Sequence, residues 1–188
     1  MELVSEAIVF ATKAHDGMRR KKSEVPYILH PMEAAVIVGT MTDDQHLIAA
    51  AALHDVVEDA GITLEEIEET FGQRVRELVA SETEDKREHL SPASTWRVRK
   101  EESLTVLKNT EDIGVLMVWL GDKLANMRSI YWEWQQKGDA MWQRFNQKDP
   151  KQQAWYYHSI AELTKALSHT PAWQEYKSLT DSVFGKGD

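Results

Sequence analysis

The sequence predicts an all-α protein. Apolar residues recur every three or four positions through most of the chain, glycines and prolines separate these segments, and no stretch alternates with period two. Of the 188 residues, 42% are hydrophobic and 28% are charged, a composition typical of a globular protein with a substantial core. No internal repeat, low-complexity segment or linker divides the chain, so residues 1–188 are expected to form one domain.

Two helices are predicted before the centre of the chain, over residues 3–16 and 31–38. A glycine follows each predicted C-terminal end, and Pro31 suits the first position of the second helix. The segment between these helices, MRRKKSEVPYI, is the densest positive patch of the sequence. A short run of charges taken alone indicates a solvated loop.

The central segment, residues 47–60 (LIAAAALHDVVEDA), is predicted to be one buried helix. Thr42 and Gln45 match a capping box before its start, where a side chain pairs with the first free backbone N–H groups. Gly61 supplies its end, because glycine is the residue that most readily follows the last turn of a helix.

Helical patterns continue to the C-terminus. Thr63 and Glu66 match a second capping box, and Gly72 interrupts the pattern that follows it. The polar residues 83–95 are predicted to form a loop. The remaining predicted helices cover residues 64–71, 75–79, 96–108, 114–134, 139–147, 152–168 and 171–183, and the tail FGKGD is expected to fray.

Composition and charge exclude several classes of protein. The net charge of −9 argues against general nucleic-acid binding, because a phosphate backbone needs a basic surface. The absence of cysteine excludes disulfides and thiolate metal sites. No apolar run reaches the roughly 18 residues of a membrane span, and the N-terminus resembles an amphipathic helix more than a signal peptide. We therefore expect a cytoplasmic protein without nucleic-acid or membrane partners, and leave its oligomeric state open.

Four ionisable residues interrupt the apolar central segment: His54, Asp55, Glu58 and Asp59. At about 100° per residue, their spacing places His54 over Glu58 and Asp55 over Asp59 on one stripe of a helix. Burying such groups is costly unless they are paired or bind a metal. An imidazole with three carboxylates is the set that a divalent metal and an activated water require. We interpret this segment as the centre of a metal-dependent hydrolase.

Two further polar residues in apolar surroundings could complete a metal site. His30 lies at the start of a predicted helix, and Asp122 lies inside the second apolar block, residues 114–134. Gly121 beside this aspartate would let another segment approach the backbone closely. Together with the His–Asp pair of the central segment, these residues make a nitrogen and oxygen set suited to Mn²⁺, Fe²⁺, Co²⁺ or Zn²⁺.

Several motifs, found in order over roughly residues 5 to 130, carry a family resemblance: IVFATKAH, RRKKSEVPYILHP, AALHDVVEDAGITLEEIEETFG, TEDK and GDKLANMR. With them the chain resembles the HD-domain metal-dependent phosphohydrolases. More narrowly, it resembles the alarmone (ppGpp) hydrolase domain of the RelA/SpoT homologues and their stand-alone small relatives. The resemblance implies a single HD-domain helical bundle of about eight to ten helices.

The resemblance also implies roles for individual residues. Glu58 and Asp59 match the acidic pair that positions or deprotonates the attacking water in this family. One divalent ion, most simply Mn²⁺, would have four ligands: His30, His54, Asp55 and Asp122.

A small nucleotide is the substrate that the resemblance implies. Arg19, Arg20 and Lys21 match a basic segment that packs on the guanine base and meets phosphate. Asn126 matches an asparagine near the substrate sugar, and Ser129 falls where the family often has a hydroxyl residue. Three further cations lie in a segment that could reach the outer phosphates: Lys86, Arg97 and Lys100.

The implied reaction removes the 3′-pyrophosphate of guanosine 3′-diphosphate alarmones ((p)ppGpp), giving GDP or GTP and pyrophosphate. One alternative is the same chemistry on another nucleotide, by an HD-type nucleotidase or pyrophosphohydrolase. The other is a non-catalytic protein that senses nucleotides. Intact Glu58 and Asp59 disfavour the sensor, which has no need of both.

The chain departs from the family pattern in two places. Gly121 stands where the family commonly has alanine, and residues 131–188, expected to pack as helices on the motif-bearing part, match no pattern. Their aromatic residues at helical spacing are expected to lie in the core: Trp132, Trp134, Trp142, Trp155 and Trp173. Five further histidines lack a context comparable to that of His30 and His54 and are expected to be structural or exposed: His15, His46, His89, His158 and His169.

Overall fold

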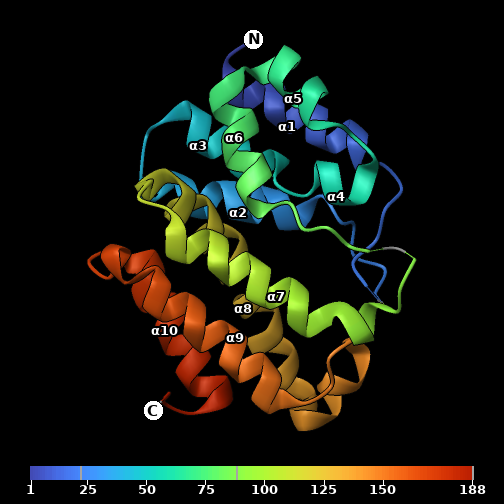
Figure 1. Ribbon diagram of the computed structural model, residues 1–188, viewed down its shortest axis with the longest axis vertical. Coiled ribbons are helices and arrows are strands. Elements are labelled where there is room, and N and C mark those ends of the chain that lie inside the picture. The colour runs from blue at the N-terminus through green and yellow to red at the C-terminus, as the bar shows by residue number, and fades with distance from the viewer. Residues whose placement is uncertain (22, 88, 188) are drawn as a thin grey trace.

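The computed structural model describes residues 1–21, 23–87 and 89–187 (Figure 1). Within these ranges every regular element is a helix, and one isolated antiparallel bridge joins Arg19 to Pro26 in the loop after the first helix. The predicted all-α class is confirmed. No helix in the described ranges is long and apolar enough to cross a membrane.

Ten α-helices and two short 3₁₀ helices follow one another in the described part of the chain. The α-helices are α1 Leu3–Ala14, α2 Leu29–Gly39, α3 Gln45–Leu53, α4 Val56–Ala60, α5 Leu64–Phe71, α6 Gln73–Glu82, α7 Pro92–Asn109, α8 Ile113–Lys137, α9 Pro150–Leu163 and α10 Pro171–Phe184. The 3₁₀ helices are η1 Gly138–Arg144 and η2 Lys165–Leu167. The predicted number of helices, about eight to ten, is therefore confirmed.

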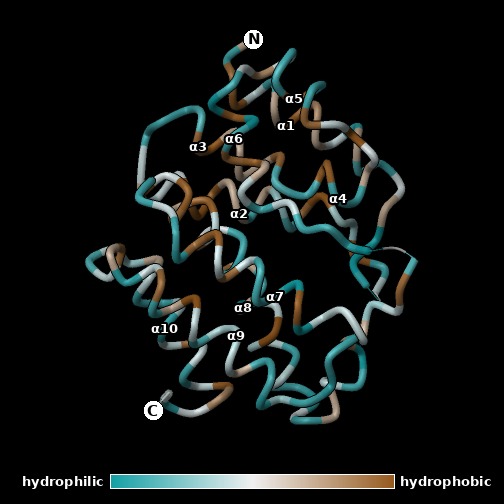
Figure 2. Tube along the Cα trace, viewed as in Figure 1, coloured by the Kyte–Doolittle hydropathy of each residue, from teal (hydrophilic) through white to brown (hydrophobic). Residues whose placement is uncertain are grey.

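The long helix α8 connects the two ends of the bundle (Figure 1). It packs against α2, α3 and α6 among the N-terminal helices, and against η1 and α10 among the C-terminal elements. Its residues Leu120, Leu124 and Met127 are fully buried. Figure 2 shows the most hydrophobic segments around α2, α3 and α6, whereas α9 and α10 are more hydrophilic.

The central segment is not one helix. α3 ends at Leu53 and α4 begins at Val56, so His54 and Asp55 form the junction between the two helices. Asp55 has φ −97° and ψ −5°, at the edge of the helical region. Aspartate favours caps and turns because its side chain competes for nearby hydrogen bonds, and here that side chain is held by groups outside the helix. The predicted stripe over a continuous helix is therefore wrong, although its residues remain neighbours.

The first predicted capping box is also wrong. The residue that caps α3 is Asp44, whose side chain accepts a hydrogen bond from the His46 N–H at 2.8 Å. Thr42 instead accepts from the Asp44 N–H at 3.1 Å, and Gln45 is already the first helical residue. Aspartate caps a helix well, and Asp44 lies directly before the helix while Thr42 lies too far from it.

The predictions that follow agree better with the structure. The capping box of α5 is confirmed, because Thr63 accepts from the Glu66 N–H at 3.2 Å and Glu66 accepts from the Thr63 N–H at 2.8 Å. Gly72, at a φ of 85°, separates α5 from α6 as expected. α7 begins at Pro92 and not at Trp96, because proline is favoured in the first turn of a helix.

The C-terminal helices differ from their predicted ranges at the ends. The predicted helix over 139–147 is the 3₁₀ helix η1. α9 begins at Pro150 and ends at Leu163, and η2 follows where the prediction continued the helix to Ser168. Periodicity locates these helices, but it does not identify the turn at which an α-helix tightens or ends.

Helices α2 and α8 approach each other closely at Gly121. A Cβ atom at this position would lie 2.6 Å from the Val38 side chain and 3.0 Å from the Ala34 carbonyl oxygen. The close approach predicted for this glycine is therefore observed. It brings the start of α2, which carries His30, next to the part of α8 that carries Asp122.

The tryptophans of the C-terminal third do not all lie in the core. Trp142 is buried, and the partly buried Trp134, Trp155 and Trp173 pack against the core. Trp132 is 64% exposed, so the prediction is wrong for this residue. Trp132 lies on the part of α8 that lines a cavity, so its ring is not covered by another helix of the bundle.

Candidate active site

Three buried side chains from distant parts of the sequence meet between α2, α3 and α8. The candidate ligand atoms of His30, His54 and Asp122 all lie within 4.8 Å of one another. The His30 Nε2 is 2.9 Å from an Asp122 carboxylate oxygen and 3.3 Å from the His54 Nε2. Each of the three side chains is at most 5% exposed. We call these residues, with Asp55, the HD cluster.

The surroundings of His54 fix which of its nitrogens can act as a ligand. Its Nδ1 lies 2.8 Å from the Ala51 carbonyl oxygen, which can only accept a hydrogen bond. Nδ1 must therefore carry the proton when the ring is neutral, and Nε2 presents its lone pair to the cluster. This arrangement is the usual one for a histidine that binds a metal, so the residues present fit a divalent ion.

Asp55 borders the cluster from the junction between α3 and α4. Its carboxylate is 3.0 Å from the His54 Nε2 and 3.5 Å from the His30 Nε2. The Tyr27 hydroxyl lies 2.6 Å from Asp55 and 2.7 Å from Asp59, and so connects the two carboxylates. Tyr27 thereby fixes the position of Asp59 relative to the cluster.

Charges in the cluster depend strongly on one another. Burial alone would lower the pKa of His54, but the carboxylates of Asp55 and Asp122 raise it well above its usual value. Burial alone would raise the pKa of Asp122, whereas Lys123 and His54 hold it well below its usual value. The site therefore stabilises positive charge between its carboxylates, as a cation-binding site requires.

Glu58 is a largely buried carboxyl group beside the cluster, with its side chain 16% exposed. Its Oε1 accepts a hydrogen bond from the Glu84 N–H at 2.6 Å. Burial raises the pKa of Glu58 to about 7, and the nearby Asp55 contributes to this rise. The Lys86 ammonium contacts the Asp59 carboxylate and donates to the Glu58 carbonyl oxygen. Glu58 thus changes its protonation state near neutral pH, as a general base should.

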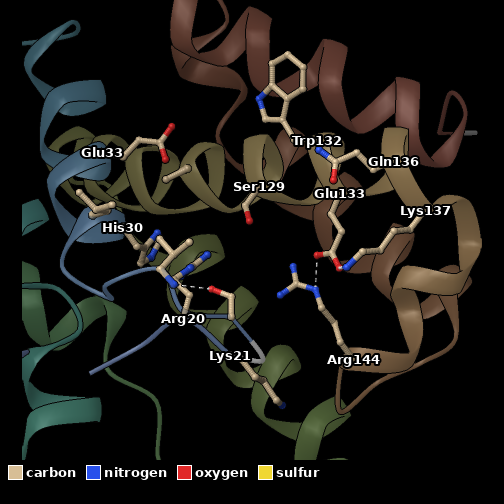
Figure 3. A pocket seen from close by; sticks show the side chains of 14 residues that line it. Arg20, Lys21, His30, Glu33, Ser129, Trp132, Glu133, Gln136, Lys137 and Arg144 are labelled. Carbon is tan, nitrogen blue, oxygen red and sulfur yellow. Dashed lines mark hydrogen bonds and ion pairs between the residues drawn. The ribbon is translucent and has the colours of Figure 1, made fainter. Parts of the chain in front are cut away.

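Two adjoining cavities lie next to the cluster. The larger has a volume of about 460 Å³ and includes His30 in its wall, so the cluster borders it directly (Figure 3). The smaller, of about 230 Å³, shares part of this lining and adds Tyr27 and Asn126. The charged residues of the larger cavity are Arg20, Lys21, Glu33, Glu133, Lys137 and Arg144.

The predicted substrate-binding residues are placed unequally around these cavities. Arg20, Lys21 and Ser129 line both cavities, and Asn126 lines the smaller one. Arg20 donates to the Asn126 side-chain oxygen at 3.3 Å. Arg19 is exposed, donates to a neighbouring carbonyl oxygen, and lines neither cavity. The structure therefore does not bring Arg19 to the site.

The cations predicted to reach the outer phosphates lie elsewhere. Lys100 forms a salt bridge of 2.7 Å with Glu84, and Arg97 stacks on the Trp155 ring at 3.4 Å. Lys86 is bound to the acidic pair beside the cluster. None of the three lines either cavity.

Other residues of the site were missed by sequence reasoning. Tyr27 precedes His30 within the YILHP motif, and its position there was the available signal. Arg144 and Trp132 lie outside the motifs, and no sequence pattern indicated them. Of the five other histidines, His15 is buried beside the site, with its ring centre 5.0 Å from that of Tyr27. His158 is half-buried, and His46, His89 and His169 are exposed.

Comparison with known proteins identifies relatives over the same region. The chain matches the family described as HD domain over residues 7–149. It is 33% identical to a GTP pyrophosphokinase of Myxococcus xanthus over 132 residues. It is 37% identical over 128 residues to a probable guanosine-3′,5′-bis(diphosphate) 3′-pyrophosphohydrolase of a Synechocystis species. These alignments cover 69% and 68% of this chain but 17% of each relative, so the chain spans about a sixth of their length.

Two solved structures share the fold over nearly their whole length. A protein of Listeria monocytogenes superimposes with a TM-score of 0.72 at 29% identity, covering 84% of this chain and 99% of the other. A metazoan orthologue of SpoT that hydrolyses ppGpp superimposes with a TM-score of 0.77 at 23% identity, covering 99% of this chain and 98% of the other. At that identity, the second likeness shows the fold alone.

Proposed function

This chain belongs to the HD-domain family, and we propose that it is a metal-dependent phosphohydrolase acting on (p)ppGpp. It would remove the 3′-pyrophosphate and release GDP or GTP with pyrophosphate. The observation that carries the proposal is the buried HD cluster at the wall of a cation-lined cavity. The relative that is itself named a 3′-pyrophosphohydrolase supports this choice of substrate.

The HD cluster would hold one divalent ion through His30, His54, Asp55 and Asp122. We propose Mn²⁺, because imidazole and carboxylate ligands suit this ion and the chain has no thiolate to select a softer one. A bound divalent ion would supply Lewis-acid activation of water and of a phosphoryl oxygen.

Glu58 would accept the proton of the attacking water. Its largely buried carboxyl, with a pKa of about 7, is ionised in a useful fraction of molecules at neutral pH and can still take up a proton. The hydrogen bond from Glu84 holds this carboxyl in place. Asp59, held by Tyr27 and Lys86, would keep the water oriented towards the phosphorus atom.

The nucleoside would occupy the larger cavity. Ser129 in this cavity and Asn126 in the adjoining smaller one offer polar groups for the sugar, and Arg20 offers a cation beside the cluster. The exposed ring of Trp132 lies at the same cavity and presents a flat apolar face to a nucleobase. A free nucleotide suits a cavity of about 460 Å³ better than a nucleic-acid strand does, in agreement with the acidic net charge.

The proposal is tested by a panel of substrates. The protein is incubated with ppGpp, GTP and nucleoside monophosphates, with and without Mn²⁺, and the products are separated by chromatography. We expect Mn²⁺-dependent loss of ppGpp with formation of GDP and pyrophosphate. Cleavage of a monophosphate while ppGpp survives would identify an HD nucleotidase instead. Binding of ppGpp without turnover in the metal-loaded protein would identify a sensor.

A further inference from the structure

The cavity extends beyond the HD cluster to a second group of cations. Arg144, at the end of η1, and Lys137, at the end of α8, line it together with Lys21. Arg144 and Lys137 belong to the region after residue 130 that carries no family motif. Figure 3 shows the Arg144 guanidinium directed into the cavity, facing the side from which Arg20 approaches.

Contacts within the chain hold Arg144 in this position. Its Nε forms an ion pair of 2.6 Å with one Glu133 oxygen, and Lys137 donates to the other oxygen at 3.0 Å. The guanidinium also lies 4.4 Å from the centre of the Phe145 ring. Neither terminal nitrogen of Arg144 donates a hydrogen bond to any of the described residues. One edge of the guanidinium is therefore anchored, and the other edge is available to a ligand.

The cavity has more positive than negative charge. Four cations line it, against the carboxylates of Glu33 and Glu133, and Glu33 is already paired with Arg128 at 3.1 Å. Burial lowers the pKa of Arg144, and repulsion from Arg20 adds to that lowering. An anion between the two guanidinium groups would relieve this repulsion. The positive charge of the cavity is opposite in sign to the net charge of −9 of the whole chain. The cavity therefore attracts anions that the rest of the molecule repels.

We propose that Arg144, with Lys21 and Lys137, binds the phosphate groups of the substrate that are not cleaved. This inference rests on the proposed function, because it assigns the second anionic end of the same nucleotide. A pyrophosphate at the HD cluster leaves the 5′-phosphates of a guanosine alarmone for the other end of the cavity. Arg144 is then a specificity-determining residue that distinguishes nucleotides by their charge at the end remote from the reaction.

The test measures binding of GDP and of guanosine by calorimetry, which requires no turnover. We expect the native protein to bind GDP at least about tenfold more tightly than guanosine. Arg144→Gln should weaken GDP binding by about tenfold and leave guanosine binding unchanged. Arg97→Gln, which removes an arginine that lines neither cavity, is the matched control and should change neither affinity by more than about twofold.

Equal weakening of GDP and guanosine by Arg144→Gln, or no weakening of either, would overturn the inference. Thermal unfolding of each variant checks that η1 remains folded after the ion pair with Glu133 is lost. If Arg144→Gln is unstable, Arg144→Lys, which retains the charge without the planar fork, should lose an intermediate part of the GDP preference. Selective loss of GDP binding in a protein that does not hydrolyse ppGpp would refute the proposed function and leave the anion site standing.

Discussion

At the scale of single residues, the burial of Glu58 sets the pH range in which it can act as the proposed general base. Because burial raises its pKa to about 7, its carboxylate form is lost as the pH falls through that value. A general base acts only when deprotonated, so kcat should rise with pH and level off above about pH 8. Turnover is measured across this range while the metal content of the protein is monitored. A kcat that stays constant between about pH 6 and pH 8 at full metal content would contradict the role of Glu58.

Residues Asp55 and Glu58 should fail in different ways when replaced. Glu58→Gln removes the proton acceptor and should lower kcat by about 10²–10⁴-fold while the bound metal remains. Asp55→Ala removes a proposed ligand and should abolish metal binding. Elemental analysis of purified protein and a turnover assay separate the two effects, and the exposed Glu65→Gln is the matched control. Equal loss of metal in both variants would refute this division of roles.

Sequence reasoning reached most of the side chains around the cluster, but not all of them. Spacing and motif resemblance indicated His30, His54 and Asp122, and the structure brings them together. Neither could distinguish Arg19 from Arg20, because the direction of a side chain in an irregular loop has no periodicity. Arg144 was missed because its contact with the cavity depends on the path of η1, and the pattern that predicted a helix over 139–147 did not show that it is a 3₁₀ helix.

At the scale of the helices, the approach of α2 to α8 sets the geometry of the cluster. Gly121→Ala places a methyl group against Val38 and the Ala34 carbonyl oxygen, so the two helices must separate. We expect the free energy of unfolding to fall by about 1–3 kcal/mol, the usual cost of overpacking. Gly39→Ala is the matched control, because its new methyl group meets only the Ile48 side chain at 3.9 Å. Denaturant unfolding measures both variants, and equal stability of the two would contradict the account.

The break between α3 and α4 shows what the sequence could not reveal about the elements. Apolar residues lie on both sides of His54 and Asp55 in the segment 47–60, and periodicity alone does not show that the helix ends between them. The interruption becomes understandable only when the contacts of Asp55 with Tyr27 and His54 are seen. The helix ends at a residue whose side chain serves the site.

At the scale of the whole molecule, α8 runs from the HD cluster to the C-terminal elements. Arg128 on this helix forms ion pairs with Glu33 of α2 and Glu175 of α10, and so joins the two ends of the bundle. The prediction that residues 1–188 form one domain remains a prediction, and it can be tested by calorimetry. We expect one cooperative unfolding transition with equal calorimetric and van't Hoff enthalpies. Two separate transitions would show that the C-terminal helices fold independently.

The fold class was predictable from the sequence. Which residues of the last third of the chain line the cavity was not. Helical periodicity extends from the first helix to α10, and the structure confirms it. The apolar pattern after residue 130 indicated packing, yet it cannot distinguish Trp142 in the core from Trp132 at the cavity. Trp132 lies on α8 and Trp142 on η1, and only the assembled bundle determines which face of each element is covered.

The proposed function requires that one divalent ion in the HD cluster supports removal of the 3′-pyrophosphate. Its most direct test adds Mn²⁺ stepwise to metal-stripped protein and follows the conversion of ppGpp to GDP and pyrophosphate. We expect no turnover without metal, a rate that saturates at one equivalent of Mn²⁺ per chain, and GDP and pyrophosphate in equal amounts. Turnover by the metal-free protein, or intact ppGpp after full metal loading, would contradict the proposed function.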